Sequence, residues 1–555
     1  MPTYLTYNKT IMRKLTLCLS VLLMLLIPMG MEAKKKVTKP EIPQLQNFPS
    51  STLSEYRLHA GEAVFRGKLI NFPKEVMDAS EEEKKEAFKM LADKLNSKGI
   101  TMYIRDAVLN TKKVRAITFN DDCTFDMKIQ LPHPMFVYLA PIRNVFMCPG
   151  DTIDFVINLT AKNKEETRII QATGLSGEVN RIVEEVDKKY TKFDQSSTFI
   201  LKNVNQMDSL MEWRNQQLAR LDSMVIKMNA GLPELQGCSP LASDIVRSYI
   251  LFQYGERIIR SGVTDFVRND LDSEKTEAFM RRYFDFIAPR EKYLFNNPMM
   301  MIAAEDDYVN DTHFCMFFRP IFAGGTTYYP YMYWPEMASE EENLTTKRTK
   351  IANGIKKVSE MYNISTNSLM LQTCLMRNVF YEQKGYKCDY DIFAENVAAI
   401  IPYITDPDLA RFTTIAYRER VKKGEASVAE DKLLTKGDSI FHRIISPYKG
   451  NVLSIDFWAM SCGPCRAGML EDREMVERLK DQPIKFIYLT DDDPEKCNKW
   501  MEENNIKGEH VFISRKEWSH LQEKFSFNGI PFHVYVDKQG KIRDIEQSVE
   551  ELLNE

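Results

Sequence analysis

Two cysteines in the C-terminal part of the chain, Cys462 and Cys465, are separated only by Gly463 and Pro464. They follow the hydrophobic run VLSIDFWA, typical of a buried strand, and precede RAGMLEDREMVERLK, which has a helical period. A strand–CxxC–helix arrangement places the first thiol at a helix N-terminus, where backbone N–H groups and the helix dipole stabilise a thiolate. We therefore expect Cys462 to be the nucleophile and Cys465 to resolve the mixed disulfide.

Three interpretations of this pair are open: a redox dithiol, half of a zinc site, and a structural disulfide. A zinc site needs two further ligands, usually a second CxxC or a histidine pair, and Cys497 stands alone in the sequence. A disulfide across two residues closes almost no loop and stabilises a fold little. The redox pair is favoured, because Pro464 suits the first turn of a helix and Gly463 lets a substrate approach closely.

The segment around the cysteines alternates between strand-like and helix-like patterns. Strands are indicated by the apolar runs at 452–457, 484–489, 511–513 and 532–536. Helices are indicated at 465–480, 494–504 and 516–525. This βαβ alternation with a closing strand predicts a C-terminal α/β domain over residues 431–555.

The preceding residues divide into three stretches with different patterns. Residues 34–50 are polar and proline-bearing, which indicates a linker. Residues 51–175 hold short runs rich in β-branched and aromatic residues, which predict a β-sandwich-like domain. Residues 176–430 show apolar positions at helical spacing, which predict an all-α middle region. Within that region the aromatic stretch 323–337 is interpreted as a packed loop, with a partner- or glycan-binding surface as the alternative.

The N-terminus resembles an export signal that begins at Met12. Arg13 and Lys14 precede an apolar run, and Met31-Glu32-Ala33 is an imperfect cleavage site. Residues 1–33 are therefore predicted to be a secretory signal peptide. An uncleaved membrane anchor is the alternative, because the apolar run approaches the length that spans a bilayer.

Cysteine usage and charge narrow the function further. Removing Cys18 with the signal leaves nine of the ten cysteines, so at least one thiol is unpaired. Those outside the CxxC pair are widely spaced and predicted to be individual core residues. The net charge of −4 argues against nucleic acid as a partner. We expect neither a metal nor a cofactor.

Two segments carry a family resemblance. The stretch DFWAMSCGPCR resembles the active-site segment of thioredoxins, and NGIPFHVYVDKQGKI, residues 528–542, resembles their later cis-proline segment. With its signal peptide and modest insertion, the chain resembles the exported TlpA/ResA-like thiol-disulfide oxidoreductases in a Bacteroidetes-type multidomain form. The specific resemblance covers about 110 residues and implies a thioredoxin fold for the C-terminal domain.

The resemblance also implies roles for individual residues. Asp456 matches the buried aspartate, whose raised pKa would let it exchange a proton with Cys465. Pro531, preceded by Ile530, matches the cis-proline that faces the cysteines, and Trp458 matches the aromatic residue beside the site.

Two departures from the family pattern concern the neighbours of this site. Ser461 stands where a bulky residue often precedes the first cysteine, and an apolar residue near Ile487 replaces the lysine partner of the aspartate. The route of the proton is therefore expected to differ from that of ordinary thioredoxins.

The function implied is a periplasmic reductase of disulfides in exported proteins, because the Gly-Pro dipeptide resembles that of the reducing members. The resemblance implies a membrane thiol reductase of the DsbD/CcdA type as electron donor. One alternative is an envelope protein whose β and helical domains bind a partner. A peroxiredoxin-like peroxidase is disfavoured, because the Pro-x-x-x-Thr-x-x-Cys pattern does not precede Cys462.

Overall fold

The structure is a computed structural model. It describes residues 42–47, 59–97, 99–109, 112–140, 143–160, 168–191, 199, 206–261, 273–313, 322–323, 326–327, 343–380, 390–426, 436–525, 527, 529–543 and 549–554. The predicted signal peptide and most of both the linker and the aromatic stretch lie outside these residues. The chain divides into two compact units, 1–43 and 44–555, and every element below belongs to the second.

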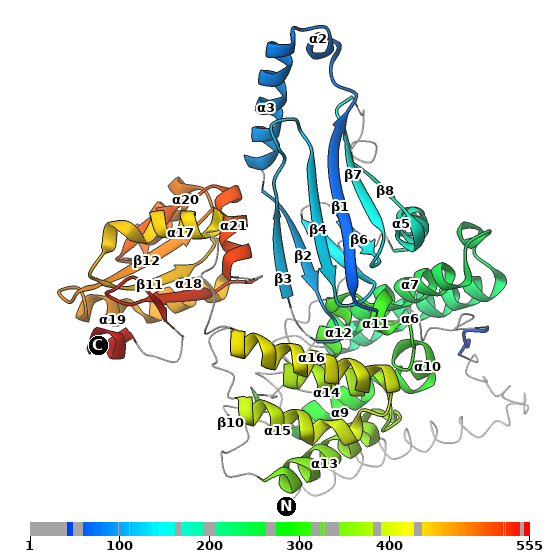
Figure 1. The fold of residues 1–555 in the computed structure, drawn as a ribbon. Helices are drawn as coiled ribbons and strands as arrows, with labels where there is room; N and C mark the ends of the chain where they lie inside the picture. The colour runs from blue at the N-terminus through cyan, green and yellow to red at the C-terminus, as the bar shows by residue number, and fades with distance from the viewer. Residues whose placement is uncertain are drawn as a thin grey trace, which may run out of the picture. The chain divides into compact units, whose positions relative to one another are not determined.

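Two four-stranded sheets follow the N-terminal segment (Figure 1). The first has the order β4-β1-β7-β8, formed by Phe125–Leu131, Gly61–Ile70, Thr152–Asn158 and Arg168–Ala172. The second has the order β3-β2-β5-β6, formed by Lys112–Ile117, Ile100–Arg105, Met135–Ala140 and Arg143–Met147. All neighbours are antiparallel except β1 and β7, which are parallel.

The two sheets share one hydrophobic core. Along β1, every second side chain from Ala63 to Leu69 is buried, as expected for a strand with one face in a core. Phe65 of the first sheet and Val137 of the second belong to the same buried cluster. Helix α2 (Lys74–Met77) and helix α3 (Glu81–Ser97) connect β1 to β2. Ser80 and Glu83 form a reciprocal capping box at the start of α3.

The middle of the chain is mainly helical. Its α-helices are α5 (Gly174–Val186), α6 (Met207–Ala230), α7 (Pro240–Ser261), α9 (Ser273–Tyr283), α10 (Glu291–Leu294), α11 (Met300–Ala303), α12 (Asp306–Thr312), α13 (Leu344–Tyr362), α14 (Leu369–Phe380), α15 (Tyr390–Ile400) and α16 (Pro407–Ala426). A π-helical turn (Asp187–Thr191) and short 3₁₀ turns link some of them. The prediction of an all-α region was wrong in one detail. Strands β9 (Phe322–Ala323) and β10 (Thr326–Thr327) form a small antiparallel pair there, and strands this short leave little periodicity to read in the sequence.

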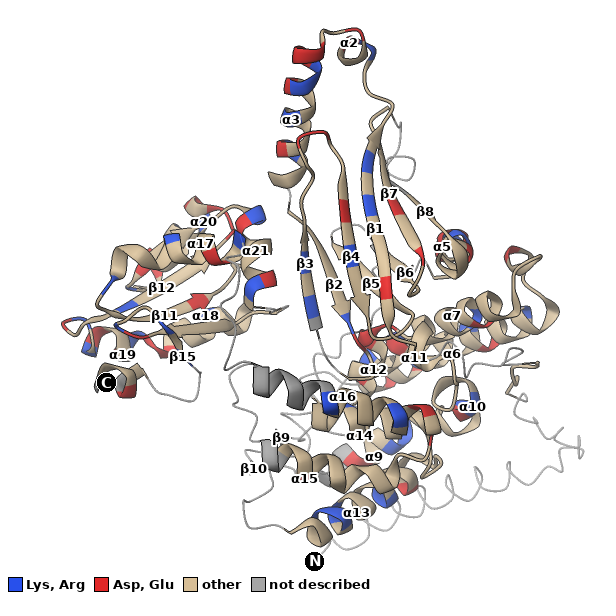
Figure 2. Cartoon of the chain, in the orientation of Figure 1, with Lys and Arg blue, Asp and Glu red and all other residues tan. Residues whose placement is uncertain are grey.

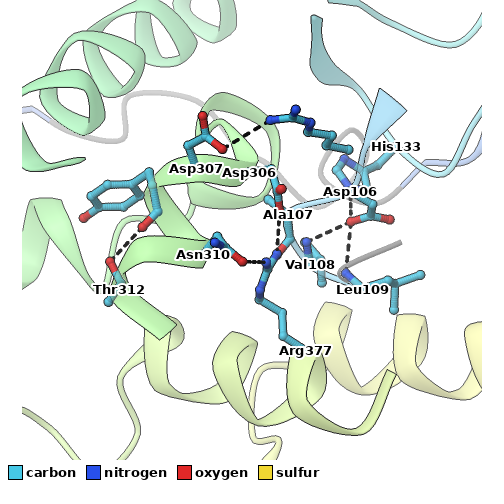
Figure 3. Close-up of polar contacts among 12 residues, drawn as sticks. Asp106, Ala107, Val108, Leu109, His133, Asp306, Asp307, Asn310, Thr312 and Arg377 are labelled. Carbon is cyan, nitrogen blue, oxygen red and sulfur yellow. Dashed lines mark hydrogen bonds and ion pairs between the residues drawn. The ribbon is translucent and has the colours of Figure 1, made fainter. Parts of the chain in front are cut away.

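A buried polar network joins the helices to the second sheet (Figure 3). The Arg377 side chain of α14 is fully buried, and its Nη1 donates to the Ala107 carbonyl at 2.5 Å and to Asp306 Oδ1 at 2.9 Å. Asp106 Oδ1 accepts from the backbone N–H of Val108 at 2.8 Å. Buried charges are tolerated only when they are paired and hydrogen-bonded, so this network fixes how the loop after β2 meets α12 and α14.

The C-terminal sheet has five strands in the order β13-β12-β11-β14-β15. They span Glu509–Phe512, Ile484–Thr490, Val452–Phe457, Phe532–Val536 and Ile542–Arg543. Strands β11, β12 and β13 are parallel, while β14 is antiparallel to both β11 and β15. The helices are α17 (Lys436–Ile445), α18 (Gly463–Glu471), α19 (Arg473–Arg478), α20 (Pro494–Glu503), α21 (Arg515–Phe525) and α22 (Val549–Asn554).

Two separate cores cover the two faces of this sheet. Ile455 and Phe457 of β11 pack with residues of α17 and α21 on one face. Val452 and Trp458 pack with residues of α18 and α20 on the other. Because side chains alternate along a strand, Asp456 belongs to the face that α18 covers.

Figure 2 shows Lys and Arg residues interspersed with Asp and Glu over the described helices and strands. In the part of the chain that the structure describes, no helix has both the length and the apolarity needed to cross a bilayer.

Candidate redox site

Cys462 and Cys465 are joined in a disulfide at the start of α18, with their Cα atoms 5.3 Å apart. Cys462 is the N-cap residue, and its sulfur accepts a hydrogen bond from the backbone N–H of Cys465 at 3.1 Å. The first cysteine is 9% exposed and the second 1%. The sulfur nearer the surface therefore lies at the helix N-terminus, where a negative charge is favoured.

The turn that carries the cysteines is open on its outer side. Gly463 and Pro464 are exposed, and a Cβ at position 463 would meet no other atom within 4 Å. Pro464 lies in the first turn of α18, where a missing N–H costs no hydrogen bond. The Met460 N–H donates to Asp492 Oδ2 at 2.6 Å and ties the turn to the end of β12. Cys462 itself is 9% exposed, so an incoming polypeptide would meet the exposed turn and the edge of this residue.

The loop before β14 lies at the same end of the sheet. The peptide bond between Ile530 and Pro531 is cis, in agreement with the resemblance. Phe532, the next residue, pairs with Phe457, the last residue of β11, and the cysteine turn follows directly after that strand. Ile530 packs against the cluster that contains both cysteines, while Pro531 is exposed.

Trp458 lies beneath the turn and is 1% exposed. It belongs to the same cluster as Cys462 and Cys465, and its ring centroid is 5.7 Å from that of Trp500. The Arg466 guanidinium lies 5.9 Å from the Trp500 ring. This packing holds the cysteine turn against the sheet.

Asp456 is buried on β11, under α18. Burial, with a smaller contribution from the charge of Asp472, raises the pKa of this carboxyl to about 7. Its Oδ1 accepts no hydrogen bond and lies 3.6 Å from Nδ1 of His533. A carboxyl with this pKa can both take up and release a proton near neutral pH.

Sequence reasoning did not identify His533 and Asp472 as neighbours of Asp456. The signal for His533 was present, because the antiparallel register of β11 and β14 pairs it with Asp456. On the opposite side, Tyr488 of β12 is in register with Asp456. Ile487, near the expected site of the missing lysine, packs in the core on the other face of the sheet. A tyrosine therefore occupies the position beside the aspartate.

The remaining cysteines in the described part of the chain are free thiols. Cys123, Cys148, Cys374 and Cys497 are buried, and Cys238 is half-buried. Burial raises the pKa of the Cys497 thiol to about 11, which disfavours the reactive thiolate. Among the described residues, no three His, Cys, Asp or Glu side chains are placed to hold a metal ion. Cys18, Cys315 and Cys388 lie outside the described residues.

These features are those of a thioredoxin-like dithiol site. Residues 434–545 match the AhpC/TSA family. The match includes both cysteines, Asp456 and Pro531, so the C-terminal part of the chain holds an AhpC/TSA domain of the thioredoxin superfamily. Because the matched stretch is a minority of the 555 residues, it assigns this AhpC/TSA domain and not the β and helical parts before it.

Solved structures similar to this chain include the thioredoxin domain of a thiol-disulfide oxidoreductase from Bacteroides vulgatus. The identity is 24%, the match covers 20% of this chain and 79% of that one, and the TM-score is 0.18. A thiol:disulfide interchange protein from Bacteroides sp. is 24% identical over 20% and 73% of the two chains, with a TM-score of 0.18. One from Chlorobium tepidum is 16% identical over 18% and 70%, with a TM-score of 0.17. No curated protein matches the chain.

Proposed function

We propose that this protein is an exported reductase that uses the Cys462–Cys465 pair to reduce disulfides of other exported proteins. The observation that carries the proposal is the placement of the two sulfurs. Cys462 lies at a helix N-terminus under an open turn, and Cys465 lies buried one turn along the helix. This asymmetry separates an attacking thiol from a resolving thiol.

The reaction begins with the pair reduced. The Cys462 thiolate attacks one sulfur of a substrate disulfide, a mixed disulfide forms, and the first substrate thiolate leaves. The Cys465 thiol then loses its proton and attacks Cys462. The Cys462–Cys465 disulfide forms and the second substrate thiolate leaves. Two electrons pass to the substrate, and both leaving thiolates take up protons from water.

Asp456 is the proposed acceptor of the Cys465 proton. Asp456 lies on the sheet face that α18 covers, Cys465 lies on α18 itself, and the raised pKa of Asp456 matches this task. A substrate chain would lie beside Pro531 and pair with the backbone of Ile530 as an added strand. The exposure of Pro531 and Gly463 supports this path.

The proposed location is the periplasm, to which the export signal at residues 1–33 would deliver the protein. Disulfides are stable in that compartment, so a reductase there requires a supply of electrons. We propose a membrane thiol reductase of the DsbD/CcdA type as the donor. The Gly-Pro dipeptide between the cysteines supports the reducing direction.

Reduction of insulin disulfides tests the proposal. Wild-type protein should reduce insulin with dithiothreitol as the electron source, and Cys462→Ser should be inactive. Cys238→Ser is the matched control, because it makes the same change at a half-buried thiol outside the pair. Equal activity in wild type and Cys462→Ser, or inactivity of the wild type, would reject the proposed reductase activity. Consumption of hydrogen peroxide by the wild type would instead support a peroxidase.

A cavity favours partner or ligand binding as a second candidate function. A space of about 350 Å³ lies between β2, β5, β6 and α12, and Tyr103, Tyr138, Asn144 and Glu305 are among its lining residues. The lining combines aromatic side chains with the charged residues Arg105, Asp306 and Asp307, and the volume lies within the range of ligand pockets. Cys465→Ala, which should trap substrates as mixed disulfides on Cys462, compares the two functions. Recovery of the same proteins without a covalent link would favour binding.

A further inference from the structure

Four titratable side chains of the AhpC/TSA domain share the sheet face under α18. Asp456 lies on β11, Tyr488 on β12, and His533 and Tyr535 on β14. Their neighbours in sequence, Ile455, Ile487 and Val534, belong to the core on the opposite face. By strand alternation, the titratable side chains lie on the sheet face that α18, the helix carrying Cys465, covers together with α20. Asp472, at the end of α18, adds a carboxyl to the group.

His533 connects this group to solvent. Its Nδ1 lies 3.6 Å from Asp456 Oδ1, and its side chain is 39% exposed whereas that of Asp456 is 11% exposed. The distance is longer than a hydrogen bond, so the two groups must approach slightly before a proton can move between them. Catalytic hydrogen bonds commonly shorten in this way when substrate binds.

The protonation states of these groups are matched for transfer. Burial raises the pKa of Asp456 to about 7 and lowers that of His533, although the charge of Asp472 opposes the latter change. A protonated Asp456 therefore faces a neutral imidazole that can accept its proton. Burial raises the pKa values of Tyr488 and Tyr535, so both phenols stay neutral and do not compete. Burial also raises the pKa of Asp472.

We propose that His533 is the proton port of Asp456 and carries the proton of Cys465 from the buried carboxyl to water. This inference rests on the proposed dithiol function. When Cys465 attacks Cys462, its S–H proton passes to the Asp456 carboxylate. The carboxyl then gives a proton to Nδ1 of His533, and the imidazolium releases a proton to water. Asp456 returns to its ionised form and can accept a proton in the next turnover.

The port also accounts for the missing lysine. A cation near Asp456 would hold the carboxyl ionised and lower its pKa. A neutral, half-exposed imidazole leaves the pKa near 7 and supplies an exit for the proton. His533 thus acts through Asp456 as a positioning and relay residue, and does not touch the sulfurs.

Single-turnover resolution of a mixed disulfide on Cys462 tests the port. In His533→Gln the resolution rate should fall by about 100-fold, the lower end of the range that general acid–base groups supply. In His533→Ala, which vacates a partly exposed space, added imidazole should restore much of the lost rate, because a free imidazole can reach Asp456 there. In Asp456→Asn the rate should also fall, but imidazole should have no effect. His442→Gln, the same change at an exposed site on α17, should match the wild type.

The outcomes distinguish a failure of the proposed relay through His533 from a failure of the proposed reductase function. A wild type that fails to reduce disulfides rejects the proposed function. An active wild type with unchanged resolution in His533→Gln rejects the proton relay alone, and so does a slowed His533→Ala that imidazole does not rescue. Thermal unfolding shows whether His533→Gln is folded. If it is not, His533→Asn, whose amide lies near the position of Nδ1, is assayed with the same imidazole rescue.

Discussion

Asp456 and His533 face each other across two antiparallel strands, with 3.6 Å between Oδ1 and Nδ1. One side chain is almost enclosed and the other reaches solvent, so the pair forms a short path from the interior to water. The buried member of this pair has consequences for the stability of the protein as well as for its chemistry.

The first prediction concerns pH and the stability of the AhpC/TSA domain. Asp456 has a raised pKa in the folded state, so it binds more protons there than in the unfolded chain between about pH 4 and pH 7. The contribution of Asp456 to the free energy of unfolding is therefore fully present at low pH. It is lost as the pH rises through the folded-state pKa of about 7. Asparagine does not ionise, so Asp456→Asn abolishes this pH-dependent decrease in the free energy of unfolding. The variant should stabilise the domain at pH 8 by at most about 4 kcal/mol.

Urea unfolding followed at pH 5 and pH 8 measures this effect. The difference between variant and wild type should be larger at pH 8. A variant that is less stable at pH 8 would mean that the carboxylate is paired in the fold.

A second prediction concerns alkylation. When the reduced, folded protein is treated with iodoacetamide, Cys462 should react first, because it is the thiol at the helix N-terminus. Cys497 should react only after unfolding, because it is fully buried and its pKa is raised to about 11. Peptide mass spectrometry over a time course gives the order. Early labelling of Cys497 would show that α20 opens readily or that this thiol takes part in exchange.

A third prediction concerns the dipeptide between the cysteines. Pro464→His places a cation beside the Cys462 thiolate and stabilises the reduced form. The reduction potential of the pair should rise by on the order of 30 mV, equivalent to 1.4 kcal/mol. Equilibration with glutathione buffers measures the potential. Pro464→Gln removes the ring without adding charge and should leave the potential nearly unchanged, so an equal rise in both variants would exclude the electrostatic explanation.

A fourth prediction concerns the buried pair of Arg377 and Asp306. Arg377→Met removes the buried guanidinium that pairs with the Asp306 carboxylate and should destabilise the protein by about 3–5 kcal/mol. Arg411→Met removes the same charge from the more exposed pair with Asp408 and should cost at most about 1 kcal/mol. Denaturant midpoints of the two variants give the comparison. Similar midpoints would show that the Arg377 network does not hold the helices to the second sheet.

The dithiol site could be largely predicted from the sequence, because the residue patterns that indicate it are local. The cysteines, the proline in the first turn and the apolar run before them lie within one short segment, and backbone geometry fixes their relation. The sulfur of Cys462 at the helix N-cap and the high pKa of Asp456 follow from this local pattern.

Contacts between distant segments were harder to predict. The pairing of His533 with Asp456 depends on the register of β11 and β14, which are separated by most of the domain. The Arg377 network depends on a loop and two helices that are far apart in sequence. No local pattern marks an arginine as buried, because its type is normally exposed.

The two cores of the C-terminal sheet contain only residues from 440 onward, whereas the cores of the β and helical parts contain only earlier ones. The environment of the cysteines is therefore set within the last quarter of the chain. Substitutions in the first 430 residues are therefore expected to leave the reduction potential of the dithiol unchanged.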